Sequence, residues 1–225
     1  MLLLVAFVFV STVNLLDGRC CAPRQWEGWG VRLGGQMAGA THERPELIKA
    51  KINLHYNADV PIVVAVANTS VGTRKRLLTA IQDFRHKTLY VLEDGGCKVK
   101  PLLEPFMELC SPEGQDGTFM WLGFGETSYP ALEYVYTFKQ QTVDTKGTMC
   151  AIWTQEACSP VSESFYGTFI GNPQVYTFSY SDIHKGIRDP SIFHIPKMCR
   201  DVNMTMTDDT PHDVIPLTSA QYFKI

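Results

Sequence analysis

The sequence predicts an all-β protein, an antiparallel sandwich or half-open barrel, because alternation with a period of two dominates it. Residues 131–138 (ALEYVYTF) and 175–180 (VYTFSY) each gather large side chains on one face of a strand. These are Leu132, Tyr134, Tyr136 and Phe138 in the first, and Tyr176, Phe178 and Tyr180 in the second. Such aromatic faces need a cover, so we expect two antiparallel sheets with one or two short helices.

Two hairpins are visible in the first half of the chain. The alternating residues 52–56 (INLHY) are followed by the turn residues Asn57-Ala58-Asp59 and then by VPIVVAVA, which is apolar enough for a buried strand. Residues 88–102 form two strand-like runs around Asp94-Gly95-Gly96, one of the stronger short-range hairpin signals.

Two other segments are assigned by different patterns. Residues 119–124 (FMWLGF) are apolar on both faces, as expected for a strand covered on both sides. Residues 73–87 (TRKRLLTAIQDFRHK) have Leu77, Leu78, Ile81 and Phe84 at helical spacing, which predicts one short amphipathic helix.

Length and charge limit the function classes. The 225 residues fit one domain, and a net charge of −3 with 20 basic residues scattered among 23 acidic ones provides no field for nucleic acid. The apolar run 2–10, together with residues 11–16, has about the length of the apolar core of a signal peptide and is too short to span a bilayer. We therefore expect a secreted chain without a transmembrane segment.

Cleavage of the signal peptide is expected after Cys20, because Gly18 and Cys20 then satisfy the small-residue rule, with a cut after Gly18 as the alternative. This gives a signal peptide at 1–20 and a single domain at 21–225, with a loosely packed tail at 200–225. An even number of cysteines in an oxidising compartment predicts three disulfides, for which fifteen connectivities are possible. The six cysteines that remain are Cys21, Cys97, Cys110, Cys150, Cys158 and Cys199.

Catalytic and metal-binding motifs are not found. The sequence has no G-x-S-x-G, H-E-x-x-H, Walker loop or C-x-x-C, and the glycine-rich residues 28–35 (GWGVRLGG) fit a flexible or bulged strand start better than a dinucleotide fingerprint. The six histidines lie far apart, and Asp208, Asp209 and Asp213 lack EF-hand spacing, so a calcium site there is only a hypothesis. The metal ligands stay unknown, and we expect no enzyme.

Two sequons become available in the secretory route, Asn68-Thr69-Ser70 and Asn203-Met204-Thr205. Both Asn68 and Asn203 are therefore predicted glycosylation sites.

The cysteine neighbourhoods carry a family resemblance. The segments CAPRQWEG (21–28), LYVLEDGGCKVKPL (89–102), CSPVSESF (158–165) and KGIRDPSIFHIPKMC (185–199) resemble the ependymin and ependymin-related family. The resemblance extends over about residues 21–199. It implies a secreted, glycosylated, disulfide-bonded β-protein whose two sheets curve around an apolar cavity, similar to bacterial lipoprotein-carrier domains.

The resemblance also implies functions and disulfide pairs. Family members are associated with lipid or ganglioside binding, calcium binding, cell–matrix adhesion and homodimers, in secreted, lysosomal or matrix locations, and without catalytic activity. The family pattern pairs Cys21 with Cys158 and Cys97 with Cys199. Another family cysteine pair is missing here, which leaves Cys110 to pair with Cys150.

The leading hypothesis is a secreted protein that binds a lipid or another apolar ligand between its sheets. The predicted cavity residues are the aromatic side chains Trp121, Tyr134, Tyr136, Phe138, Trp153, Tyr176 and Phe178. The alternative is a structural component of an extracellular, mineralised matrix that acts through glycans, an acidic surface and calcium.

Overall fold

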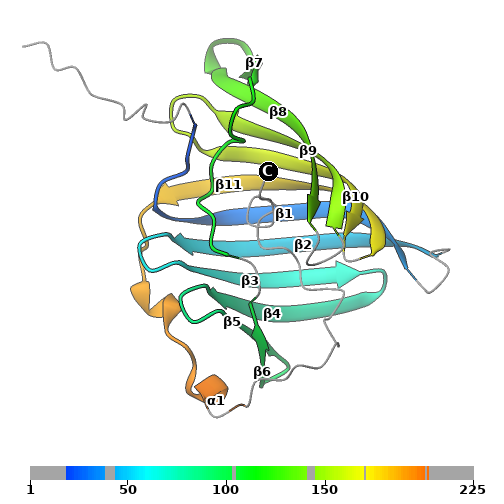
Figure 1. The fold of residues 1–225 in the computed structure, drawn as a ribbon, viewed down its shortest axis with the longest axis vertical. Helices are drawn as coiled ribbons and strands as arrows, with labels where there is room; N and C mark the ends of the chain where they lie inside the picture. Colours follow the sequence, from blue (N-terminus) through cyan, green and yellow to red (C-terminus); the bar gives the residue numbers. More distant parts are fainter. Residues whose placement is uncertain are drawn as a thin grey trace, which may run out of the picture.

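The chain forms a single antiparallel sheet of eleven strands (Figure 1). The computed structural model describes residues 19–38, 44–102, 105–140, 145–169, 171–200 and 202. The strands are β1 (Gln25–Ala38), β2 (Arg44–Asn57), β3 (Ile62–Val71), β4 (Arg74–Asp83), β5 (Thr88–Glu93), β6 (Gly96–Pro101), β7 (Thr118–Leu122), β8 (Tyr129–Gln140), β9 (Thr145–Thr154), β10 (Pro160–Phe169) and β11 (Asn172–Lys185). The helical segments are the 3₁₀ turns η1 (Gly125–Thr127) and η2 (Pro190–Phe193) and the short helix α1 (Lys197–Arg200). The predicted all-β class is confirmed.

The sheet consists of two meanders joined in the middle. Its strand order is β6-β5-β4-β3-β2-β1-β11-β10-β9-β8-β7, so β6 and β7 form its two edges and it is not closed into a barrel. Strands β1 and β11 pair from Trp26 opposite Lys185 to Gln36 opposite Gln174. The two expected sheets thus correspond to the two meanders, and hydrogen bonds across this central pair make them one sheet. Figure 1 shows β8, β9 and β10 running obliquely to β2 and β3.

Both predicted hairpins are confirmed. After β2, the side-chain oxygen of Asn57 accepts hydrogen bonds from the backbone N–H groups of Asp59 (3.0 Å) and Val60 (3.3 Å) and so shapes the turn into β3. Between β5 and β6, Asp94 and Gly95 have φ angles of 51° and 74°. Positive φ at both central residues defines the type I′ turn, which matches the twist of the strands it connects.

The predicted amphipathic helix at 73–87 is wrong, because this segment contains strand β4. Leu78 is buried on one face, whereas Leu77 is 68% exposed on the other. Ile81 shares the face of Leu77 and is buried, because Ile192, Phe193 and Ile195 cover it there. The four apolar residues fit helical spacing, but β4 pairs with β3 on one side and β5 on the other. Tertiary pairing therefore overrides the local pattern.

The expectation that residues 119–124 are buried on both faces is also wrong. Strand β7 pairs with β8 and lies at the end of the strand order, where nothing pairs with its other side among the described strands. Phe119 is 52%, Trp121 61% and Phe124 91% exposed. Its position at the edge of the sheet explains the difference.

One face of the sheet carries the main core, and we call it the inner face. Alternating side chains from both meanders point to it and form one apolar cluster that runs, in strand order, from β5 to β8. The opposite face, the outer face, has a smaller cluster in which Ile62, Val64 and Ile81 pack against the segment 192–195. The two clusters explain why strands β3 and β4 are apolar on both sides.

Three disulfides connect the sheet to the segments around it: Cys20–Cys158, Cys21–Cys110 and Cys97–Cys199. The pair implied for Cys97 is present, but those implied for Cys21 with Cys158 and for Cys110 with Cys150 are wrong. Residues 20–22 run antiparallel to residues 109–111, with hydrogen bonds from Ser111 N–H to Cys20 O (2.7 Å) and from Ala22 N–H to Leu109 O (2.8 Å). Successive side chains of an extended segment point in opposite directions, so the two adjacent cysteines bind different partners.

Candidate functional site: the inner face of the sheet

Glycine residues at the centre of the sheet make room for aromatic rings. On β1, alternate positions face inward, and three of them are Gly28, Gly30 and Gly34. A Cβ atom at Gly30 would lie 2.1 Å from the Phe178 ring, and one at Gly34 would lie 2.3 Å from the Val175 carbonyl oxygen. The side chains of β11 therefore lie directly over β1.

Sequence reasoning saw only part of this feature. A bulged start of β1 was expected, and the register does shift between Glu27 and Trp29. The row of inward-facing glycines was missed. The spacing of Gly28, Gly30 and Gly34 by even numbers was the signal, because even spacing places residues on one face of a strand.

Aromatic rings line the inner face in two series, and neighbouring rings within each series are in contact. Phe165 lies between Phe138 (5.8 Å between centroids) and Tyr176 (5.2 Å). The second series runs from Phe178 through Tyr180 (4.8 Å) and Trp26 (6.3 Å) to Tyr56 (5.7 Å). Rings at these separations attract each other beyond the effect of burial alone.

Six of the seven predicted cavity residues lie in this inner cluster, namely Tyr134, Tyr136, Phe138, Trp153, Tyr176 and Phe178. Trp121 does not, since it lies on the exposed edge strand β7 and contacts Phe119 at 5.4 Å between ring centroids. The structure thus brings together the predicted aromatic residues of β8, β9 and β11, and leaves out the one on β7.

A buried arginine lies among these rings. Arg32 of β1 is 4% exposed, and its guanidinium carbon lies 4.0 Å from the centre of the Tyr176 ring. The guanidinium donates a hydrogen bond to the side-chain oxygen of Gln174 (2.9 Å), whose amide donates to Gln36 (3.0 Å). Gln36 in turn donates to Glu46 (3.1 Å). This polar row leads from the aromatic interior toward the start of β2.

A buried carboxyl group lies on the same face. Glu163 of β10 is 2% exposed. Burial, followed by the charge of Glu163, raises the pKa values of Tyr136 and Tyr180 well above the usual range. Burial also raises the pKa of Tyr176 to about 12, although Arg32 opposes the shift. The three tyrosines are therefore neutral hydroxyl groups at physiological pH.

Arg32 and Glu163 were missed by sequence reasoning. Both occupy inward-facing positions on their strands, Arg32 between two glycines and Glu163 two residues before Phe165. A charged residue in phase with apolar neighbours was the available signal, because a buried charge requires specific partners.

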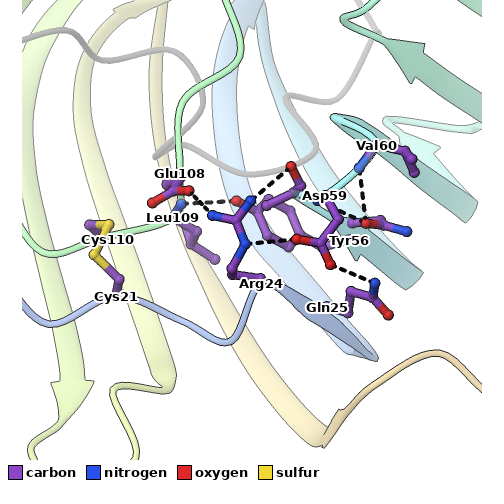
Figure 2. Close-up of polar contacts among 11 residues, drawn as sticks. Cys21, Arg24, Gln25, Tyr56, Asp59, Val60, Glu108, Leu109 and Cys110 are labelled. Carbon is purple, nitrogen blue, oxygen red and sulfur yellow. Dashed lines mark hydrogen bonds and ion pairs between the residues drawn. A yellow bond between two sulfur atoms is a disulfide. The ribbon is translucent and has the colours of Figure 1, made fainter. Parts of the chain in front are cut away.

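Polar contacts connect the segment before β1 to the β2–β3 turn and to the β6–β7 connection (Figure 2). Arg24 forms ion pairs with Asp59 in the β2–β3 turn and with Glu108 in the β6–β7 connection. Its pKa is raised first by the hydrogen bond to Asp59 and then by the charge of Glu108. The Tyr56 hydroxyl accepts a hydrogen bond from the backbone N–H of Leu109 (3.2 Å), beside the Cys21–Cys110 disulfide. Three segments far apart in sequence are thus held together.

A second polar contact attaches the C-terminal segment to the sheet. Glu27 on β1 pairs with Arg188 (3.1 Å) and lies 3.5 Å from the Nδ1 atom of His55 on β2. Burial lowers the pKa of His55, although the charge of Glu27 opposes the shift. Because the pKa of His55 differs between the folded and unfolded states, the free energy of unfolding depends on pH.

In the described part of the chain, Cys21, Glu108 and Cys110 form a compact group, but both sulfur atoms belong to a disulfide and Glu108 pairs with Arg24. Asp208, Asp209 and Asp213 lie outside the described residues. Burial, with a hydrogen bond to Glu133, raises the pKa of the free Cys150 thiol to about 11. A thiol with such a pKa is a poor nucleophile.

A groove of about 630 Å³ lies away from the inner face, between the β4–β6 region and the C-terminal segment. Asp83, His86, His194 and Arg200 are among its lining residues, and none of the predicted cavity residues takes part. Of the two predicted glycosylation sites, Asn68 is exposed on the outer face of β3, and Asn203 lies outside the described residues.

The class of protein is defined by this combination: a disulfide-linked, half-open antiparallel sheet whose inner face joins aromatic rings to a few buried polar groups. The ependymin family model matches residues 72–199, more than half of the chain. The chain belongs to the ependymin family, which confirms the resemblance. Family membership supports an extracellular glycoprotein role in general, and the family is generally non-catalytic.

Two curated relatives cover most of the chain. Mammalian ependymin-related protein 1 of Rattus norvegicus is 26% identical over 186 residues, which is 80% of this chain and 76% of that protein. The protein of the same name in Mus musculus is 26% identical over 184 residues, with the same shares. No helix in the described part of the chain has the length and apolar character needed to span a bilayer.

Proposed function

We propose that this protein is a secreted extracellular glycoprotein that binds a hydrophobic or amphipathic ligand of the lipid or ganglioside class against its inner face. The observation that carries the proposal is the association of aromatic rings with Arg32, Gln174 and Glu163, all at most 7% exposed. An all-apolar core would serve stability alone as well or better, because removing charged groups from water costs free energy that even ion pairing often does not repay.

The chemistry of the face matches an amphipathic molecule. Apolar contact would supply affinity, at about 0.8 kcal/mol for each CH₂ group removed from water. Arg32 and the tyrosine hydroxyls would orient the polar end of the ligand, since the guanidinium binds carboxylate or phosphate groups in a fixed geometry. We therefore expect lipids with an acidic head group to bind more tightly than neutral ones.

The test is native mass spectrometry and organic extraction of the secreted protein, followed by titration with fluorescent fatty acids. Arg32→Gln should weaken binding of the acidic lipid and leave a neutral analogue with the same chain unaffected. Arg85→Gln is the matched control, because Arg85 is exposed and lies outside the inner face. Circular dichroism of each variant checks that the fold is retained.

Two results would oppose the proposal. One is a secreted protein that carries no lipid and binds none in the titration. The other is equal weakening by Arg32→Gln for acidic and neutral lipids with the fold retained, which would remove the orienting role of the guanidinium.

Calcium-linked adhesion and a homodimer belong to the same proposal but have separate tests. Calcium should raise the melting temperature if a site exists, since a ligand that binds the folded state stabilises it. Sedimentation at several concentrations gives the oligomeric state. The alternative, a matrix component, is supported by a lysine-lined groove on the outer face.

A further inference from the structure

Three lysines gather on the outer face around one groove. Lys49 and Lys51 extend from β2 and Lys75 from β4, and all three line a groove of about 410 Å³. Strand β3 lies between them, with Asn68 opposite Lys51 and with Ser70 opposite both Lys49 and Lys75. Adjacent strands are about 4.8 Å apart, so Lys49 and Lys75 are separated by about 10 Å at the backbone.

Within the described part of the chain, these ammonium groups have no carboxylate counter-ion. In the described residues no carboxylate lies within 4.0 Å of any of the three, whereas Arg24, Arg74 and Arg76 are all paired with carboxylates. The whole chain carries a net charge of −3. Like charges on neighbouring strands repel each other, so three unpaired cations on an acidic protein are better explained by an external anion than by stability.

The edges of the groove are apolar. Val31 and Leu33 of β1 are 46% and 54% exposed and line the groove beside the lysines. The Lys51 ammonium lies 4.5 Å from the centre of the Trp29 ring, which keeps this lysine close to the surface of the sheet. The groove therefore combines cations, an amide, a hydroxyl and flat apolar edges.

We propose that this groove binds a sulfated polysaccharide of the extracellular matrix. A sulfated chain carries anions at short, regular intervals, which matches lysines spaced along and across the strands. Its hydroxyl groups match Asn68 and Ser70, and the C–H faces of its sugar rings match Val31 and Leu33. A linear chain enters a groove between side chains, whereas a flat bilayer contacts only the surface around it.

The predicted glycosylation site lies in the same groove, because Asn68 is one of its lining residues. A glycan on Asn68 would occupy the space in which the polysaccharide is proposed to bind. We therefore expect the two occupants to exclude each other, so that the form without a glycan at Asn68 is the binding form. This inference is independent of the ligand proposed for the inner face.

The test uses full-length secreted protein produced with tunicamycin, which blocks N-glycosylation and leaves Asn68 and Ser70 in the groove unchanged. Binding to immobilised heparin is measured by surface plasmon resonance at several salt concentrations. The triple variant Lys49→Gln/Lys51→Gln/Lys75→Gln should lose roughly tenfold or more in affinity, since each exposed charge contributes modestly. Lys98→Gln/Lys139→Gln/Lys185→Gln is the matched control, with three exposed lysines on other strands.

Retained binding in the control and loss in the first triple variant would support the groove. Equal loss in both would indicate a general charge effect and overturn the proposal, as would a glycan-free protein that does not bind heparin. Binding to anionic phosphatidylserine vesicles that depends on Lys49, Lys51 and Lys75, without heparin binding, would assign the surface to a membrane instead. Lipid titration of the same variants separates this result from failure at the inner face.

Discussion

Arg32 of β1 and Glu163 of β10 lie on opposite sides of Phe178, because both residues pair with it across the sheet. The two residues are thus two strand spacings apart, about 10 Å at the backbone, on a face that is otherwise mostly apolar. The Phe178 ring itself lies over Gly30, where a Cβ atom would come within 2.1 Å of it, and the Arg32 guanidinium lies over the Tyr176 ring. A substitution at Gly30 therefore acts directly on the ring of the residue that Arg32 and Glu163 flank in the sheet.

The first prediction concerns Gly30, which lies under the Phe178 ring. Gly30→Ala should lower the free energy of unfolding by about 1–3 kcal/mol, because the new methyl group forces the buried ring to move. Gly35→Ala is the control, since its nearest contact, the Glu46 carbonyl oxygen at 3.7 Å, is ordinary van der Waals contact. Guanidinium unfolding with the disulfides intact measures both changes.

A double mutant makes this prediction specific. In Gly30→Ala/Phe178→Ala the two effects should not add, because the second substitution removes the ring that the first displaces. If Gly30→Ala proves as stable as Gly35→Ala, the close approach of β11 to β1 described above is wrong.

The second prediction is that the mature protein begins at Arg19. The disulfide Cys20–Cys158 requires Cys20, so the cut expected after Cys20 conflicts with it and the cut after Gly18 does not. Cys20→Ser should cost about 4–5 kcal/mol in the chain-entropy model for a loop of 138 residues. N-terminal sequencing and mass spectrometry of unreduced peptides are the measurements. A mature chain that begins at Cys21 would contradict the pairing.

The third prediction is that Cys150 has a free thiol that is alkylated slowly. A pKa of about 11 leaves a small thiolate fraction at pH 8, so alkylation by iodoacetamide should be slow in the folded protein. Glu133→Gln should speed the reaction, because removing the carboxylate lowers the pKa of the thiol. The modified residue is identified by peptide mapping. Unreduced, unfolded protein in which Cys150 resists alkylation would revive the expected Cys110–Cys150 disulfide.

The fourth prediction is that acid destabilises the protein through His55. Burial lowers the pKa of His55 in the folded state, so below its unfolded pKa of about 6.5 the unfolded chain binds a proton that the folded chain does not. The free energy of unfolding should therefore fall as the pH drops through this value. His55→Gln should flatten this part of the profile, whereas His184→Gln, at an exposed histidine, should not. Identical slopes in the two variants would oppose the assignment.

Local signals predicted a large part of the fold. The alternation in β8 and β11 and the Asp94-Gly95 turn depend on neighbouring residues, so the sequence alone identified them. The prediction of a helix at 73–87 failed because the apolar residues of this segment are compatible with both a helix and a strand. Pairing with the adjoining strands β3 and β5 decides the outcome, and the spacing of apolar residues within the segment does not show this pairing.

The residues of the candidate site were likewise predicted only in part. Six aromatic residues were predicted from strand phase alone, but the burial of Arg32 and Glu163 depends on the whole sheet. The two wrong disulfide pairs share this cause: Cys21 and Cys110 meet because residues 20–22 run beside residues 109–111, a contact between segments about 90 residues apart.

The central pairing of β1 with β11 has a consequence for synthesis in the cell. The first strand described in the sheet pairs with the last, so a growing chain exposes the free edge of β1 until β11, about 150 residues later, has been made. Long-range pairing of this kind slows folding, and open strand edges promote aggregation. Folding of this chain should consequently depend on chaperones that shield β1 and on oxidation of Cys20 only after Cys158 has emerged.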